Sequence, residues 1–403
     1  MSILSGKRIV LGVTGSIAAY KAVDLASKLT QAGAQVDVIL TSSAEKFVAP
    51  LTFQSVTGRR AYTDKDLWGN EAHVLHVGLG HEADLLIIAP CTANTIAKLA
   101  HGQADTLLTV TALASTAPFM IAPAMDGGMY GHPATQENLN TLKKRNTTII
   151  QPAEGHLASG LTGVGRLPET QELIGHIRLI LGRGGLLADK KVLVTAGGTQ
   201  EPLDPVRVLT NRSSGRQGYA LAQAALDAGA QVTLVTTPTA LTSPVGTKVV
   251  EVETAKQMLD AVLKEFPEHD TLIMAAAVAD FRPKDVSENK IKKEGGVPQI
   301  NLEATDDILK AVADLKHGKK RKQVVAGFAA ESQNLLKNAS NKLQSKKLDL
   351  IAANDISAND AGFSVKTNRI TLLYADGRTD SLPLISKTEA AEIIIERIAA
   401  LLE

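Results

Sequence analysis

The second half of this 403-residue chain holds polar side chains whose types suit an anionic, nucleotide-like ligand. Asn211 offers amide donors and Arg207 a fixed cation, and both groups can meet a carboxylate or a phosphate. Lys342 and Lys346 are one helical turn apart, so that their two charges can clamp a triphosphate. Asp280 follows a run of small alanines at a strand end, where it can bind a ribose, a base amine or Mg²⁺. Because the chain has no Walker A sequence, the site is not that of a P-loop enzyme.

The first half carries small polar residues at the ends of three predicted strands. Residues 12–21 (GVTGSIAAYK) join the first strand to the first helix, where Gly15 allows a tight turn and Ser16 can cap the helix. Similar residues follow the next strands at 41–43 and 92–94. The dinucleotide fingerprint GxGxxG is absent. Three such loops on one sheet edge fit a mononucleotide phosphate and ring better than a dinucleotide.

Three further features have two interpretations each when they are taken alone. His73, His76 and His81 lie close together in the sequence, but a single histidine is more often a core or surface residue than a catalytic one. The glycine-rich stretch 155–166 is either a flap that closes a pocket or a surface loop. The lysines of 290–293 are either a solvated charge run or part of a site.

Composition excludes several classes of function. The formal charge of +1 and the aromatic content of 3% argue against a nucleic-acid partner, and the charge gives no reason for binding an acidic membrane. Cys91 is the single cysteine, which excludes a disulfide framework and a CxxC metal site. No apolar stretch approaches the roughly 20 residues of a membrane span, and the amino terminus lacks a secretory pattern. These features predict a soluble cytoplasmic protein.

The two halves repeat one scheme, which predicts the fold class. Both contain the string AGAQV, at 32–36 and at 228–232, after an apolar strand and a helix. The second half has about 15 additional residues between its first strand and first helix, roughly 201–215. Because ligands of open α/β sheets bind at the carboxyl ends of strands, that insertion is placed to build a separate active site.

We therefore predict an α/β protein of two Rossmann-like three-layer domains with mainly parallel sheets, the second ending in a β-hairpin. A first helix is expected over 18–31, ended by Gly33, and a last helix from about Thr388. Glycines indicate a linker at 182–188. Predicted strands are 9–13, 36–40, 85–89, 119–122 and 148–151, then 192–195, 232–236, 249–252, 272–276, 324–328, 350–353 and the hairpin strand 370–374 with its turn at 375–378.

The first half resembles the homo-oligomeric flavin-containing cysteine decarboxylases, specifically phosphopantothenoylcysteine decarboxylases. The resemblance runs in order through GVTGSIAAYK (12–21), HVGL (76–79), APCTANTIAKLA (89–100), PAMDGGM (123–129) and ASGLTGVGR (158–166). It implies a domain over 1–186 that binds FMN and decarboxylates phosphopantothenoylcysteine after oxidation of its thiol towards a thioaldehyde. The implied FMN contacts are Gly15, Ser16, Ile17, Thr41, Ser43, Thr92, Ala93 and Asn94, and the implied substrate contacts are Met129 and Arg166.

The same resemblance gives His76 the catalytic histidine role, while two positions depart from the family pattern. Asp126 stands where asparagine usually grips the substrate carboxylate, and Ser159 stands where many members have a proton-donating cysteine. An ionised Asp126 would repel a carboxylate, so it must be protonated, paired or differently employed. Ser159 is a weaker acid than a thiol, so the reductive step needs another proton donor. Cys91 belongs to a flavin-binding motif and is not assumed to be that donor.

The second half resembles the phosphopantothenate–cysteine ligases, which implies a ligase domain over 187–403. The matching strings are TAGGTQEPLDPVR (195–207), NRSSG (211–215), AAVADF (276–281), KIKK (290–293), GFAAES (327–332), KLQSKKLD (342–349) and AAND (352–355). The implied substrates are phosphopantothenate, cysteine and CTP with Mg²⁺, joined through an acyl-cytidylate. Asn211 then holds the acyl group and Lys290 stabilises charge. The implied substrate and nucleotide contacts are Arg207, Met274, Ala275, Ala276, Asp280, Asp307, Ile308, Phe328, Lys342 and Lys346, with Asp280 also the metal candidate.

In tandem, the halves resemble the bifunctional proteins of bacterial coenzyme A biosynthesis. The resemblance implies a homo-oligomer, with trimers through the flavin domain that place flavin between subunits, dimers through the ligase domain, and a dodecamer from both. One alternative is an active ligase whose flavin domain only binds flavin and assembles the oligomer. Another is a non-enzymatic regulatory protein on the same scaffold, which the complete set of ligase motifs disfavours.

Overall fold

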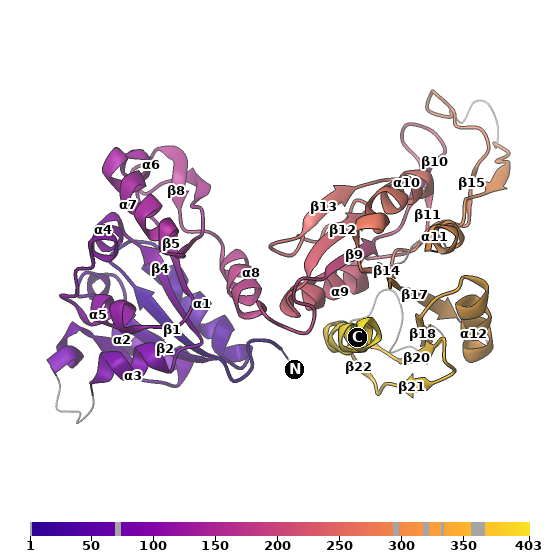
Figure 1. The fold of residues 1–403 in the computed structure, drawn as a ribbon. Helices are drawn as coiled ribbons and strands as arrows, with labels where there is room; N and C mark the ends of the chain where they lie inside the picture. Colours follow the sequence, from indigo (N-terminus) through magenta and orange to yellow (C-terminus); the bar gives the residue numbers. More distant parts are fainter. Residues whose placement is uncertain (1, 69–73, 293–297, 317–321, 332–333, 356–366) are drawn as a thin grey trace. The chain divides into compact units, whose positions relative to one another are not determined.

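The structure is a computed structural model that describes residues 2–68, 74–292, 298–316, 322–331, 334–355 and 367–403. The chain divides into two compact units, Met1–Leu181 and Gly182–Glu403, and each is an α/β unit by itself (Figure 1). None of the described helices is both long and apolar enough to cross a membrane.

The first unit is built on a parallel six-stranded sheet in the order β3-β2-β1-β4-β5-β6. Its central strands are apolar and buried along nearly their whole length, as expected for strands covered by helices on both faces. The strand order reverses between β1 and β4, which opens a crevice at their carboxyl ends. The strands are β1 (Arg8–Val13), β2 (Gln35–Leu40), β3 (Ala61–Thr63), β4 (Leu85–Cys91), β5 (Phe119–Pro123) and β6 (Thr148–Ile149).

Helices cover both faces of this sheet (Figure 1). One core cluster joins the sheet to α1, α2 and α8, and the other joins it to α3, α4, α5 and α7. A separate hairpin, β7 (Ala153–His156) with β8 (Thr162–Arg166), holds the glycine-rich stretch and is named the flap below. The helices are α1 (Ala19–Gln31), α2 (Pro50–Thr57), α3 (Leu75–His81), α4 (Ala93–His101), α5 (Leu107–Ala114), α6 (Gly127–Gly131), α7 (Pro133–Lys144) and α8 (Thr170–Leu181), with 3-10 turns η1 (Ala44–Lys46) and η2 (Asp64–Trp68).

The second unit has an eight-stranded sheet in the order β13-β12-β9-β14-β17-β18-β20-β21. It is parallel from β13 to β18 and closes with antiparallel β20 and β21. The strands are β9 (Lys191–Ala196), β12 (Gln231–Thr236), β13 (Lys248–Glu251), β14 (Thr271–Met274), β17 (Val324–Glu331), β18 (Leu350–Asp355), β20 (Ile370–Tyr374) and β21 (Thr379–Ser381). The predicted fold class, including the terminal hairpin, is confirmed.

In the second unit, α10, α11 and α12 pack on one face of the sheet, while α9 and α13 pack together and contact β9 and β17. Three small strand pairs stand apart from the main sheet: β10 (Gln200–Pro202) with β11 (Val208–Thr210), β15 (Phe281–Pro283) with β16 (Leu302–Ala304), and β19 (Thr367–Asn368) with β22 (Ile385–Ser386). The helices are α9 (Arg216–Asp227), α10 (Ala255–Glu265), η3 (Phe266–Glu268), α11 (Ile308–Lys316), α12 (Leu335–Ser345) and α13 (Lys387–Leu402).

The hairpin β10–β11 accounts for the asymmetry between the halves. In the first unit β1 ends at Val13 and α1 begins at Ala19, whereas in the second β9 ends at Ala196 and α9 begins only at Arg216. The predicted insertion is therefore a small antiparallel arm at the carboxyl end of the central strand. The glycine-rich stretch after α8 packs on α9, since the Leu187 N–H donates to the Ala228 carbonyl at 2.7 Å.

Candidate active sites

A cavity of about 460 Å³ lies at the carboxyl ends of β1, β2, β4 and β5 in the first unit. It brings together most of the residues expected to contact flavin, but Ile17 and Ala93 are not among its lining. Ile17 is 58% exposed. The lining residues are Gly15, Ser16, Thr41, Ser42, Ser43, Thr92, Asn94, Thr95, Lys98, Thr106, Thr109, Ala124, Met125 and Met129.

The loop after β1 is fixed against its neighbours by short contacts. The Thr14 hydroxyl donates to the Pro90 carbonyl at 2.7 Å and accepts from the Thr92 N–H at 3.0 Å, which ties the ends of β1 and β4 together. A side-chain carbon on Gly15 would lie 2.4 Å from Cβ of Ser43, so only glycine fits there. The two loops therefore meet directly at the cavity.

Ser16 does not cap the first helix as the sequence suggested. The helix begins two residues later than that assignment requires, with Ala18 in the cap position and no side-chain cap. The Ser16 hydroxyl instead accepts a hydrogen bond from the Ala18 N–H at 3.3 Å. Ser16 thus holds the turn before α1 and lines the cavity from there.

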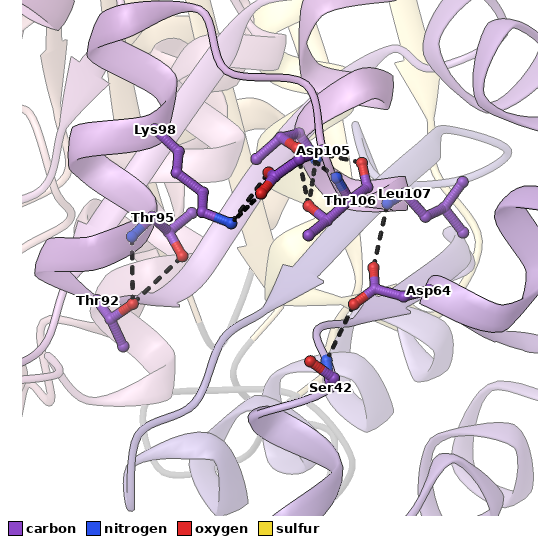
Figure 2. Close-up of polar contacts among 9 residues, drawn as sticks. Ser42, Asp64, Thr92, Thr95, Lys98, Asp105, Thr106 and Leu107 are labelled. Carbon is purple, nitrogen blue, oxygen red and sulfur yellow. Dashed lines mark hydrogen bonds and ion pairs between the residues drawn. The ribbon is translucent and has the colours of Figure 1, made fainter.

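Two helix N-termini also border this cavity (Figure 2). Thr92 caps α4 by accepting from the Thr95 N–H, and Thr106 caps α5 in a reciprocal capping box with Thr109. Lys98 joins the two helices, since its Nζ lies 2.9 Å and 2.7 Å from the carboxylate oxygens of Asp105. Helix N-termini carry partial positive charge, so this end of the cavity suits an anion.

Asp64 connects the loop after β2 to the start of α5 (Figure 2). Its Oδ2 accepts from the Ser42 N–H at 3.2 Å, and its Oδ1 accepts from the Leu107 N–H at 3.1 Å. One carboxylate therefore sets the spacing between two walls of the cavity. Nothing in the sequence around Asp64 marked it as a site residue.

Asp126 and Ser159, the two departures from the family pattern, contact each other. The Ser159 hydroxyl donates to Oδ2 of Asp126 at 2.7 Å, and the Gly128 N–H donates to Oδ1 at 2.9 Å. These two hydrogen bonds hold the pKa of the Asp126 carboxyl below its usual value, and the bond from the Ser159 hydroxyl has the larger effect. The carboxylate is therefore ionised at neutral pH, caps α6 and binds the tip of the flap.

The flap is also attached near its base. The Met125 N–H donates to the Gly165 carbonyl at 3.0 Å, and a side chain on Gly165 would collide with the Met125 carbonyl. Arg166 lies against Gly155 within the hairpin and pairs with Glu169 at 3.3 Å. Arg166 does not line the cavity, although Met125 and Met129 beside the flap do.

His76 lies half-buried in the first turn of α3 and does not line the cavity of its own unit. His81 is exposed at the end of the same helix, and His73 lies outside the described residues, as do Lys293 and Ser332 of the matched strings. Cys91 is fully buried in β4 and does not line the cavity, and burial raises the pKa of its thiol.

The second unit has a cavity of about 400 Å³ at the carboxyl ends of β14 and β17. It collects Asn211 and all the residues expected to contact the nucleotide except Arg207. Lys290 is also outside the lining. The lining residues are Asn211, Met274, Ala275, Ala276, Ala277, Val278, Ala279, Asp280, Thr305, Asp306, Asp307, Ile308, Leu309, Phe328, Lys342 and Lys346.

Hydrogen bonds from the inserted hairpin place Asn211 in this cavity. The Thr210 hydroxyl donates to the Thr199 carbonyl at 2.7 Å, and Nδ2 of Asn211 donates to the Val278 carbonyl at 3.1 Å. The Thr199 hydroxyl accepts from the Ala279 N–H at 2.9 Å. The amide oxygen of Asn211 is not used in these bonds.

The two lysines reach the cavity from the end of α12. Nζ of Lys342 donates to the Phe328 carbonyl at 2.9 Å, and Lys346 forms an ion pair with Asp307. Asp307 also accepts from the Lys310 N–H at the start of α11. Among the described residues, no group of three or more histidine, cysteine, aspartate or glutamate side chains is arranged to hold a metal ion.

Comparison with known proteins assigns both units. The family model described as "Flavoprotein" matches residues 2–181, and the model described as "DNA/pantothenate metabolism flavoprotein C-terminal domain" matches residues 187–402. The coenzyme A biosynthesis bifunctional protein CoaBC of Bacillus subtilis is 45% identical over 401 residues, covering 99% of this chain and 98% of that protein. The same-named protein of Vibrio vulnificus is 42% identical over the full length of both chains. A crystal structure of the C-terminal domain of a CoaBC protein covers 54% of this chain and 98% of its own, with 41% identity and a TM-score of 0.47.

The fold, the two cavities and the paired family models define a two-domain flavoprotein with a separate site in each domain. The full-length relatives make the assignment specific: the chain belongs to the family of the bifunctional coenzyme A biosynthesis proteins CoaBC. It is a bifunctional enzyme in which a flavoprotein phosphopantothenoylcysteine decarboxylase is joined to a phosphopantothenoylcysteine synthetase, the ligase predicted above.

Proposed function

We propose that the second unit uses CTP to join phosphopantothenate to cysteine through an acyl-cytidylate. The 400 Å³ cavity is the observation that carries this proposal, because it combines alanine-rich walls with paired lysines. A substrate carboxylate oxygen attacks the α-phosphorus of CTP and displaces pyrophosphate. The amine of cysteine then attacks the acyl carbon and displaces CMP, forming the amide.

The cavity residues singled out from the sequence each have a role in this scheme. Asn211 is held by Val278 through its amide nitrogen, which leaves its oxygen to orient the acyl group or the attacking amine. Lys342 and Lys346 meet the triphosphate, and Lys346 must first leave Asp307. Asp280 lines the same cavity and is the side chain we assign to Mg²⁺ that accompanies the nucleotide. Arg207 and Lys290 act from outside the described lining.

We propose that the first unit binds FMN in the 460 Å³ cavity. The residues present fit the group: hydroxyl side chains, two helix N-termini and the close Gly15–Ser43 contact form a cradle for a phosphate. The exposed side chains of Ile17 and Met129 supply apolar surface for a ring system. When bound, FMN would supply a two-electron oxidation of the substrate's cysteine side chain, which makes loss of carbon dioxide possible, and the matching two-electron reduction of the decarboxylated ene-thiol that gives the thiol product.

The protein groups around this cavity then act on the substrate. We assign proton transfer to His76 and closure of the flap over the substrate to the Asp126–Ser159 hydrogen bond. Because the Asp126 carboxylate is ionised and occupied, the substrate carboxylate must be met by other donors, and Arg166 in the flap is the cation that we assign to it.

We further propose that His76 acts on the flavin of a neighbouring subunit in a trimer. His76 does not line the cavity of its own chain, and Tyr20, Leu113 and Met129 are exposed by 61%, 67% and 52% in the first unit. The second unit exposes apolar side chains on and beside its β10–β11 and β15–β16 strand pairs, which suits a dimer. These are Val206, Val208, Leu209, Phe281 and Leu302. Trimers and dimers together build a dodecamer.

One observation favours a second function for the first unit, namely a flavin-binding assembly module without decarboxylation. The hydroxyl proton of Ser159 is directed at Asp126 and is therefore not presented to a substrate. Mass spectrometry of the products separates the two functions. Phosphopantetheine formed from phosphopantothenate, cysteine, CTP and Mg²⁺ supports two working sites, whereas accumulation of phosphopantothenoylcysteine supports a ligase with a silent flavin domain.

A further inference from the structure

We propose that Asp204 is a positioning residue for ligation: its carboxylate joins the β10–β11 loop to the segment that carries Lys290 and so holds Lys290 beside Arg207. The inference rests on the ligase function proposed above, in which both cations act on the substrates. Asp204 itself is not among the residues that line the cavity.

Asp204 is buried in an otherwise exposed loop. It is 2% exposed, whereas the residues that follow it in the loop, including Val206 at 64%, are exposed. A carboxylate buried in this way requires hydrogen-bond partners, because removing a charge from water is otherwise costly. The hydrogen-bond partners of Asp204 therefore identify the segments that its carboxylate positions.

The carboxylate of Asp204 receives hydrogen bonds from two separate segments. Oδ1 accepts from the N–H groups of Val206 and Arg207 at 2.8 Å and 2.9 Å, which fixes the turn between β10 and β11. Oδ2 accepts from the Ile291 N–H at 3.1 Å. Ile291 directly follows Lys290, so this bond fixes the backbone beside the proposed catalytic lysine.

Arg207 strengthens the same junction from its side chain. One guanidinium nitrogen lies 3.3 Å from Oδ2 of Asp204, and another donates to the Ile291 carbonyl at 3.2 Å. A further backbone bond runs from the Ser287 N–H to the Leu203 carbonyl at 3.1 Å. The two loops are therefore connected at several points, with the Asp204 carboxylate at the centre.

The bonds outweigh burial in setting the charge of Asp204. Burial raises the pKa of the Asp204 carboxyl. The hydrogen bonds from the N–H groups of Val206, Ile291 and Arg207, together with the Arg207 charge, lower it by more, so the net shift is downward. An anion is the form that accepts all of these bonds. Asparagine has one acceptor oxygen and an NH₂ group, so it would turn two donors toward each other at Ile291 or at the turn.

The test compares Asp204→Asn with the full-length wild-type enzyme in the ligation reaction. Because misplacing a catalytic group by about 1 Å costs on the order of 100-fold, we expect kcat for ligation to fall by about that factor. KM for CTP should change little, because Asp204 does not touch the cavity. The matched control is Asp285→Asn, which removes an exposed carboxylate from the Lys290 loop and should leave ligation unchanged.

A double-mutant cycle with Lys290→Ala decides whether Asp204 acts through Lys290. If it does, Asp204→Asn causes a much smaller loss of kcat in the Lys290→Ala background than in the wild type, and the remainder reports the contact with Arg207. Fully multiplying losses would overturn the inference, since they would mean that Asp204 does not act through Lys290. Wild-type ligation by Asp204→Asn would also overturn it. Should Asp204→Asn fail to fold, Asp204→Glu, which keeps the charge but displaces the oxygens, takes its place in the cycle.

The same experiment separates this inference from the proposed function. If Lys290→Ala ligates at the wild-type rate, the proposed role of Lys290 is wrong, and the inference falls with it. If Lys290→Ala is impaired but neither Asp204 variant is, the ligase proposal stands and only the role of Asp204 is rejected. Flavin absorbance of the first unit should be the same in all variants.

Discussion

The Ser159 hydroxyl donates a hydrogen bond of 2.7 Å to Oδ2 of Asp126, so the two positions that depart from the family pattern are direct partners. Asp126 lies at the start of α6, and Ser159 lies at the tip of the flap. The pair therefore links the start of α6 to the turn of the β7–β8 hairpin. The two side chains thus form one hydrogen-bonded pair.

Replacing Ser159 should change the pH dependence of decarboxylation. Ser159 is the largest cause of the lowered pKa of Asp126, so Ser159→Ala raises that pKa towards its ordinary value. The carboxylate then becomes protonated at a higher pH. We expect the acidic limb of the pH–rate profile to move to higher pH. Ser159→Thr keeps the hydroxyl and serves as the control, and an unmoved limb in Ser159→Ala would contradict the role of the pair.

The two activities should be separable by single substitutions. Asn211→Asp places a negative charge in the ligase cavity, where anionic substrates must bind, and should abolish ligation while decarboxylation is preserved. His76→Asn should do the reverse. Product analysis with phosphopantothenate and with phosphopantothenoylcysteine measures each reaction alone. Equal loss of both activities in either variant would show that the division of labour between the units is wrong.

How much of the fold was predictable depended on strand length and burial. The strands β1, β2, β4 and β9 are apolar runs buried on both faces, and the sequence identified all of them within one or two residues. The short strand β3 was missed, as were the arm strands β10 and β11, because two or three residues show no periodicity. The insertion that contains the arm was nevertheless located by the internal repeat.

The sites were predictable where loops carry motifs and not where the fold supplies neighbours. Gly15, Thr41 and Thr92 were expected in one cavity, and the structure places them there. Lys98 and Thr106 also line it, but they come from α4 and the residue before α5, and the sequence did not single out either side chain as a site residue. Contacts of this kind depend on tertiary packing, which sequence spacing does not show.

The contact between Gly15 and Ser43 should control flavin binding. Gly15→Ala places a carbon 2.4 Å from Cβ of Ser43, so the loops after β1 and β2 must separate. Overpacking costs about 1–3 kcal/mol, and we expect flavin affinity to fall by about 10-fold or more. Fluorescence titration of the full-length apoprotein with FMN measures this. Gly131→Ala is the control, because no atom lies within 4 Å of the added carbon; equal affinities would contradict the cradle.

Mixed oligomers should show whether His76 serves a neighbouring subunit. His76→Asn is expected to lack decarboxylation when pure, and Gly15→Ala to show strongly reduced decarboxylation at limiting FMN because it holds little flavin. If His76 acts in trans, reassembled mixtures contain sites where an intact histidine meets an intact flavin cavity, and activity returns. If mixing after subunit exchange restores nothing, although exchange is demonstrated by differently tagged chains, His76 acts within its own chain. The ligase activity of each variant confirms that its second unit is folded.

The carboxylate of Asp64 should matter for flavin binding without touching the flavin. It accepts from the N–H groups of Ser42 and Leu107 at 3.2 Å and 3.1 Å and so sets the distance between two cavity walls. Asn can accept only one of these bonds and would face the other N–H with its own NH₂ group. Because a hydrogen bond to a charged group contributes about 1.5–3 kcal/mol, we expect Asp64→Asn to weaken FMN binding by about 10-fold.

The control Glu137→Gln removes a charge from the exposed side of α7, and it should bind FMN as the wild type does. Unchanged FMN affinity in Asp64→Asn would mean that the two walls are held together by other contacts.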